Sequence, residues 1–140
     1  MKGPIVIDNA KFWYTEGILF IEIINEDPSL RLPKLSLEKY LMVIEDLCEG
    51  MITPFCIDMR KAVGTYSIEA AKLFANGNKL NNIRIAEAFI SGKIGIKLSI
   101  RSFKRIYDAD IPYEIFDTKE QALAYCRSFV PNIPTRTNLN

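Results

Sequence analysis

Hydrophobic positions near the start of the chain gather in two short runs separated by a polar pair. Residues 12–15 and 18–24 are rich in aromatic and β-branched side chains, which favour strands. Glu16 and Gly17 lie between them, and the glycine supplies the positive φ that a tight turn between antiparallel strands requires. The pattern therefore predicts an N-terminal β-hairpin.

The hydrophobic period then changes to that of a helix. After a polar loop at 25–33, apolar side chains between Leu37 and Cys48 recur every three to four residues. Ser36 has the residue type of an N-cap, and Gly50 that of a helix end. We expect an amphipathic helix from Ser36 to Cys48.

From residue 54 onward, apolar runs of strand length alternate with segments that have helical character. We expect strands at 54–59, 83–90 and 113–116. A short helix is expected at 67–75, a second at 94–107, and a third that begins with a capping box at Asp117 and Glu120 and ends before Pro131.

A hairpin followed by repeated helix-strand units is typical of the α/β class, because each crossover helix returns the chain to start a parallel strand. We expect a mixed, mostly parallel sheet of about five strands with about four helices. At 140 residues with 49% hydrophobic residues, the chain fits one domain over 1–130. The polar segment 131–140 is expected to be a flexible C-terminal tail.

Composition argues against an enzyme. The chain has no histidine, which removes the commonest general base and transition-metal ligand. Cys48, Cys56 and Cys126 lack the spacing of a metal site and read as reduced core thiols. We expect no catalytic residue, no metal and no cofactor. The N-terminus lacks a secretory apolar region, so a cytoplasmic protein is expected.

Candidate functional residues cluster after the strand at 54–59. In parallel sheets, ligands and partners meet the loops at the carboxyl ends of strands, and among those loops 60–66 is the longest. Ser67 at the following helix start is either an ordinary N-cap or a phosphorylation site, with Thr65 as a less well placed candidate. Asp58 and Arg60 share a face of the strand end and are expected to pair. The functional alternative is that Arg60, Lys61 and the helix start at Ser67 together bind an anion or a partner carboxylate.

Basic residues also recur every four positions in the predicted helix 94–107. Lys93, Lys97, Arg101 and Arg105 form this series, and Lys104 lies beside the last. The simpler interpretation is a helix face exposed to solvent. The functional alternative is that these residues contact an acidic protein or an anionic membrane surface. Nucleic acid is not expected as a partner, because the net charge is only +1 and no aromatic side chains interleave with the stripe.

The aromatic triplet Phe12, Trp13 and Tyr14 must send neighbouring side chains to opposite faces of the sheet. One face is core. If the other is left open by the helices, its aromatic surface would suit a homodimer or a small apolar ligand.

The order of elements resembles the STAS domain, the sulphate-transporter and anti-sigma-factor-antagonist fold, and its small bacterial relatives grouped with SEC14-like lipid-binding domains. Asp58, Met59 and Ser67 have that family's spacing, and Glu120 to Leu123 resembles the opening of its last helix. The Asp and Gly that flank the family's phosphorylated serine are absent, since the chain reads Tyr66-Ser67-Ile68-Glu69.

The resemblance implies a bacterial protein with a non-catalytic regulatory or protein-interaction domain that docks another protein, or itself as a homodimer, through the loop and helix start at Arg60 to Ser67. The alternative that it implies is a carrier of a small apolar ligand or lipid, of SEC14-like type.

Overall fold

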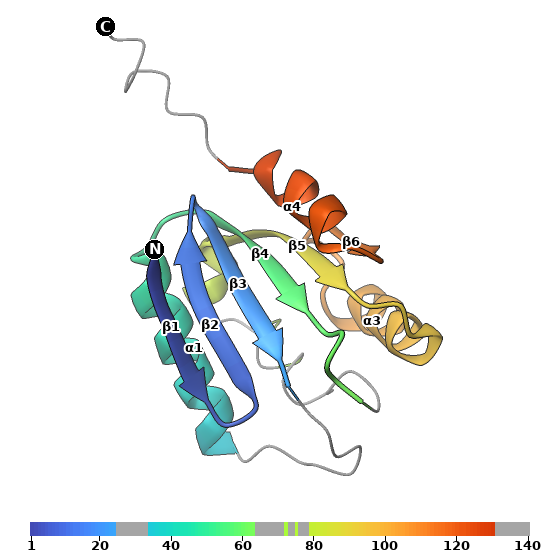
Figure 1. The fold of residues 1–140 in the computed structure, drawn as a ribbon, viewed down its shortest axis with the longest axis horizontal. Coiled ribbons are helices and arrows are strands. Elements are labelled where there is room, and N and C mark those ends of the chain that lie inside the picture. Colours follow the sequence, from blue (N-terminus) through green and yellow to red (C-terminus); the bar gives the residue numbers. More distant parts are fainter. Residues whose placement is uncertain (25–33, 64–71, 73–74, 76–78, 131–140) are drawn as a thin grey trace, which may run out of the picture.

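A six-stranded sheet organises the computed structural model, which describes residues 1–24, 34–63, 72, 75 and 79–130. The order of strands across the sheet follows their order in the chain (Figure 1). The strands are β1 (Lys2–Ile7), β2 (Ala10–Thr15), β3 (Ile18–Ile23), β4 (Thr53–Asp58), β5 (Arg84–Ile90) and β6 (Tyr113–Phe116).

The sheet is antiparallel at its N-terminal side and parallel beyond it. β1, β2 and β3 pair antiparallel, whereas β3 to β6 pair in parallel. The helical elements are α1 (Lys34–Cys48), the short 3-10 helix η1 (Lys79–Asn82), α3 (Ile94–Tyr107) and α4 (Lys119–Arg127). The expected α/β class with an N-terminal hairpin and a mixed, mostly parallel sheet is confirmed.

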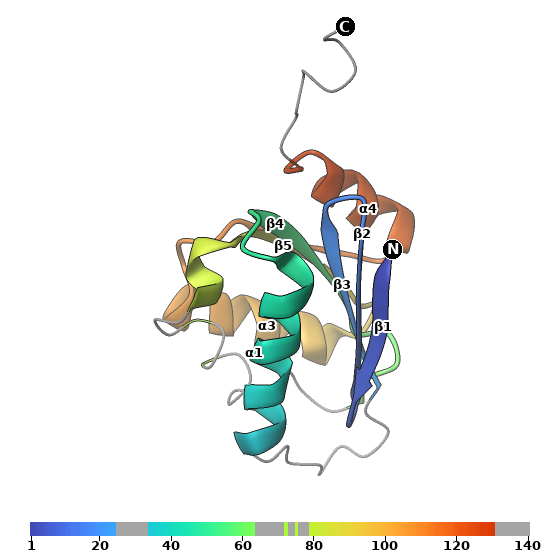
Figure 2. The same ribbon diagram turned by 90° about the vertical axis from the view of Figure 1, so that its left-hand side faces the viewer.

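Two helical layers enclose the sheet. α1 and α3 lie on one face and α4 on the other (Figure 2). Successive parallel strands advance in one direction across the sheet, so right-handed crossovers bring their helices to the same face. The larger core, between the sheet and α1, includes Phe12, Phe55 and Phe89. A smaller core beneath α4 includes Phe20 and Cys126.

The first strand, β1, is absent from the sequence-based expectation of about five strands. Its apolar run, residues 5–7, is short, and it contains Pro4, a residue that strands accept mainly at a sheet edge. β1 is an edge strand, and a two-residue turn joins Ile7 to its partner Ala10 on β2. Asp8 in this turn adopts a positive φ of 49°, which aspartate tolerates better than most residues. The apolar run before Asp8 is the feature of the sequence from which β1 could have been predicted.

Helix boundaries differ slightly from those expected. α1 begins at Lys34, so Ser36 lies inside its first turn instead of capping it. α4 is capped by Thr118, whose hydroxyl accepts a hydrogen bond from the Gln121 amide at 3.2 Å, one residue later than the expected capping box. Within the described residues, no helix is long and apolar enough to cross a bilayer. Most of the expected helix at 67–75 and all of the C-terminal tail lie outside those residues.

Candidate functional site

The carboxyl ends of β4, β5 and β6 meet at one edge of the sheet. Asp58, Ile90 and Phe116 are register partners there, and backbone hydrogen bonds continue the pairing beyond the strand ends. The Met59 amide donates to the Ile90 carbonyl at 2.9 Å, and the Ser91 amide donates to the Phe116 carbonyl at 3.0 Å. The segments that follow these strands therefore lie side by side along one edge of the sheet, as the parallel order of the strands predicts.

Asp58 and Arg60 form the expected ion pair. The guanidinium makes two bonds to the carboxylate, from Nε to Oδ1 at 3.0 Å and from Nη2 to Oδ2 at 2.7 Å. The Arg60 backbone amide adds a third at 3.0 Å. Burial opposes the ionised carboxylate, but these hydrogen bonds and the nearby positive charges outweigh it, so the pKa of Asp58 lies below its usual value. This geometry fixes the turn that begins at Arg60.

Lys61 is also occupied by a carboxylate of its own sheet. Its ammonium lies 3.3 Å from the carboxylate of Glu22, which is the register partner of Asp58 on β3. Two acidic strand ends are thus each matched by a cation from the same turn. An external anion would have to compete with Asp58 and Glu22, which argues against a dedicated anion site at Arg60 and Lys61.

Three of the five basic residues expected in a stripe serve the fold. Lys93 Nζ donates to the carbonyl of Ala62, and Lys97 lies 3.0 Å from Asp117. Lys104 is only 2% exposed, so the prediction that it belongs to an accessible surface is wrong. It follows Ile100 by four residues and therefore projects from the buried side of α3.

The remaining outer side of α3 is accessible and mixed in character. Ile94 and Leu98 are 73% and 63% exposed, and Arg101 and Arg105 are exposed without an ion pair among the described residues. Their spacing of four, three and four residues places all of them along one side of the helix. We call these four residues the α3 face. The bond from Lys93 to Ala62 joins its beginning to the turn after β4.

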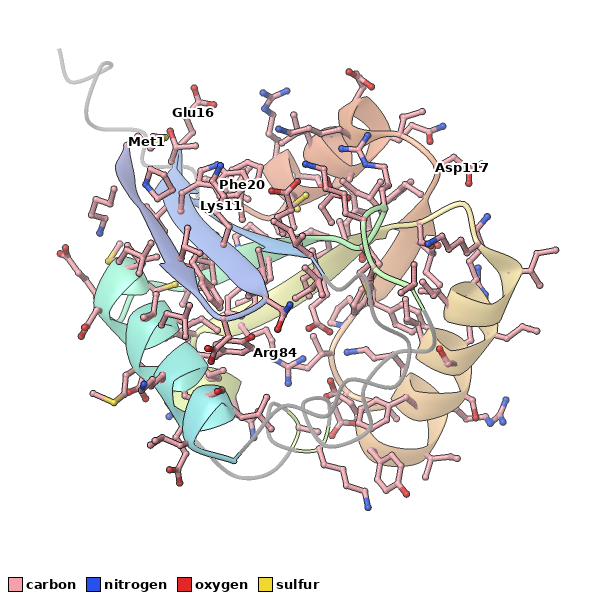
Figure 3. The ribbon with its side chains drawn as sticks, turned by 60° about the horizontal axis from the view of Figure 1, so that its bottom comes forward. Met1, Lys11, Glu16, Phe20, Arg84 and Asp117 are labelled. Atoms are coloured by element: carbon pink, nitrogen blue, oxygen red, sulfur yellow. The ribbon has the colours of Figure 1, made fainter. Side chains whose placement is uncertain are left out.

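A buried charge cluster between β5 and α3 was not expected. Arg84 Nη1 lies 3.1 Å from Glu87 and 2.8 Å from Asp108, and Lys104 lies 2.6 Å from Asp108. Lys104 also pairs with Glu87 and lies 5.4 Å from the centre of the Tyr113 ring. Arg84 lies within the molecule, in contrast to Asp117 at its margin (Figure 3). Two cations and two carboxylates neutralise one another here and fasten α3 to the sheet.

The sequence did hint at this cluster, because an arginine and a glutamate interrupt the apolar run of β5. Their partners could not be predicted from the local pattern, since these lie on the next helix and just beyond its end. Side chains that are nearly inaccessible and already paired have no room for a substrate. The cluster is therefore a structural element.

The aromatic triplet divides between the two faces as expected. Phe12 packs against Tyr40 of α1 with ring centres 5.2 Å apart. Trp13, on the opposite face, stacks on Phe20 at 5.2 Å with planes 3° apart, and Lys119 lies 5.9 Å from its ring. Trp13 is thus partly covered by neighbours within its own chain.

Ser67 and Thr65 lie outside the described residues, so their roles stay predictions. Among the residues that are described, no three acidic, cysteine or histidine side chains converge in a way that could hold a metal ion.

Comparison with known proteins identifies the fold. The chain is similar to the crystal structure of an uncharacterized protein of the DUF3478 family with a SpoIIAA-like fold, from Shewanella loihica PV-4. The TM-score is 0.57 at 18% identity, over 84% of this chain and 91% of that one. The STAS-like fold implied by the sequence is thereby confirmed. No curated protein matches the chain. Residues 12–130 match the family described as Domain of unknown function (DUF7793), and the protein therefore belongs to that family.

Proposed function

We propose that this chain is a non-catalytic STAS-like interaction domain that docks another protein on the α3 face, beside the turn that follows β4. The observation that carries the proposal is the exposure of Ile94 and Leu98 in line with two exposed arginines. Apolar side chains bordered by charge are a common composition for protein interfaces.

The charge distribution favours an acidic partner. Around the carboxyl edge, the cations of Arg60, Lys61 and Lys97 each meet a carboxylate of this chain. Arg101 and Arg105 have no such pairing among the described residues and can offer their charge to a partner. A partner with carboxylates bordering an apolar patch would complement the α3 face and would be attracted to it before contact.

The surroundings of the α3 face are fixed before binding. Lys93 holds the start of α3 to the turn at Ala62, and Lys97 holds its second turn to Asp117. The Asp58–Arg60 pair fixes the turn from the other side. A surface ordered in advance loses less conformational entropy on binding, which raises affinity.

The test is site-specific photo-crosslinking in the native host. A photoreactive amino acid replaces Leu98 in one variant and Met42 on α1 in a matched control, since both side chains are 63% exposed. The proposal expects a protein adduct at position 98 that is absent at position 42. The variant Arg101→Glu in the position 98 background should abolish that adduct through charge repulsion.

Three outcomes would count against the proposal. The first is the same set of adducts at positions 98 and 42. The second is an adduct at position 98 that persists when Arg101 is reversed in charge. The third is an adduct with a second copy of this chain, which would make the α3 face a homodimer contact.

A further inference from the structure

Two of the three free cysteines lie against each other in the core beneath α4. Cys56 projects from the central strand β4 and is 2% exposed, and Cys126 projects from α4 and is fully buried. Both belong to the smaller core, together with Ile90 and Ala122. The two residues are far apart in sequence and on different elements, so the tertiary fold alone brings them together.

The Cys126 sulfur lies beside the β4 backbone next to Cys56. It is 3.7 Å from the carbonyl oxygen of Phe55, the residue that precedes Cys56 on β4. When both thiols are protonated, Cys126 can donate to that carbonyl, and when Cys56 is ionised, Cys126 can donate to its sulfur instead. Both side chains enter the same small core, which makes the two thiols neighbours there.

The surroundings distinguish the two sulfurs. Interaction with the neighbouring Cys126 thiol outweighs burial and, with the positive charges of Lys119 and Arg60 against the negative charge of Asp58, lowers the pKa of Cys56. Interaction with Cys56, together with burial, raises the pKa of Cys126. Cys56 is thus the better nucleophile of the pair, and Cys126 is positioned to react with it in a second step.

We propose that Cys56 and Cys126 form an oxidation site at which hydrogen peroxide produces a disulfide between β4 and α4. The Cys56 thiolate attacks one peroxide oxygen and forms an S–O bond as the O–O bond breaks. The released hydroxide takes a proton and leaves as water. The Cys126 sulfur then attacks the Cys56 sulfenic acid, forming the S–S bond, and the second hydroxide leaves with the Cys126 proton as water. One peroxide and two thiols give one disulfide and two waters.

The burial of both sulfurs limits which oxidants can reach them. Both sulfurs are nearly inaccessible, which excludes direct attack by a bulky disulfide on the closed fold. Peroxide is small and uncharged and can enter during brief openings of the short helix α4. The site lies on the opposite side of the sheet from the α3 face, and it stands independently of the proposed function (Figure 2).

The test is thiol counting after graded exposure of the folded protein to hydrogen peroxide. We expect free thiols to fall from three to one, with loss of two hydrogen atoms from the intact mass and recovery of both on reduction. Peptide mapping should find Cys56 linked to Cys126 and Cys48 still free. Cys48 is a built-in control, since it is also buried but lies in the larger core. The exposed methionine Met1 reports the peroxide dose by its own oxidation.

Variants separate pairing from general thiol oxidation. Cys126→Ser should abolish the two-hydrogen loss, whereas Cys48→Ser should leave it unchanged. The proposal is overturned if both thiols stay reduced at doses that oxidise Met1. It is equally overturned if Cys56 proceeds to sulfinic acid without pairing, or if the disulfides formed involve Cys48 or link two molecules.

Discussion

Replacement of Lys104 by methionine tests whether the buried charge cluster holds α3 to the sheet. Methionine preserves much of the length and apolar stem of lysine, so the change removes the charge without opening a large cavity. Arg84 would then face both Glu87 and Asp108 alone, at 3.1 Å and 2.8 Å. Glu87 is 2% exposed and cannot recover its lost partner from solvent.

The expected loss of stability follows from that uncompensated charge. Removing one member of a buried ion pair costs about 3–5 kcal/mol. Because Arg84 continues to contact both carboxylates, we expect the lower end, about 3 kcal/mol. At about 3 °C for each kcal/mol in a domain of this size, the midpoint of thermal unfolding should fall by about 10 °C.

Lys97→Met is the matched control for this measurement. It makes the same substitution on the same helix, but its partner Asp117 is 70% exposed. An exposed pair contributes about 1 kcal/mol or less. Chemical denaturation of both variants gives the free energies to compare. Equal losses for Lys104→Met and Lys97→Met would refute the assignment of a buried, stabilising cluster.

A double variant tests the mechanism further. Lys104→Met with Glu87→Gln removes one charge of each sign and leaves the Arg84–Asp108 pair neutral. Its loss should be smaller than the sum of the two single losses, because residues of one network are energetically coupled. Strictly additive losses would mean that the four charges act independently.

Two further predictions concern pH and backbone conformation. Burial opposes the ionised carboxylate of Asp58, but bonding to Arg60 lowers its pKa. The contribution of this pair to folding stability should therefore persist at neutral pH and fade as the pH drops below about 4. The difference in unfolding free energy between wild type and Asp58→Asn should shrink over that range, and a difference that grows on acidification would contradict this. Gly17→Ala should destabilise the protein by roughly 1 kcal/mol, because Gly17 has a φ of 79° and a Cβ there would lie 3.0 Å from Val130. Gly95→Ala, on open helix surface, should instead stabilise it by up to about 1 kcal/mol. Denaturation midpoints of the two variants that shift in the same direction would contradict this prediction.

Hydrophobic periodicity predicted most of the elements because each depends on short-range pattern. The strand expected at 83–90 is β5, Arg84–Ile90, and the helix expected at 94–107 is α3 with the same bounds. β1 was missed because its stability comes from pairing with β2, and a lone short run carrying Pro4 gives a weak local signal.

The fate of the charged residues was far harder to predict than the elements. Lys97 and Lys104 look alike in the sequence, yet one meets exposed Asp117 and the other is enclosed with Glu87. A shift of seven residues along a helix turns the side chain by only a small angle, so Lys97 and Lys104 project from nearly the same side of α3. What separates them is the neighbour that the fold brings to each position, which the local pattern does not contain. Asp58 with Arg60 was predictable because both lie on one short segment.

The strand order, in which each strand neighbours the one that precedes it in the chain, also bears on synthesis by the ribosome. A growing chain can add each new strand to an edge that already exists, and no central position has to wait for a later segment. At every stage the newest strand is the exposed growing edge. In the finished protein this edge is β6, Tyr113–Phe116, whose four residues offer a short template for unwanted pairing with other chains.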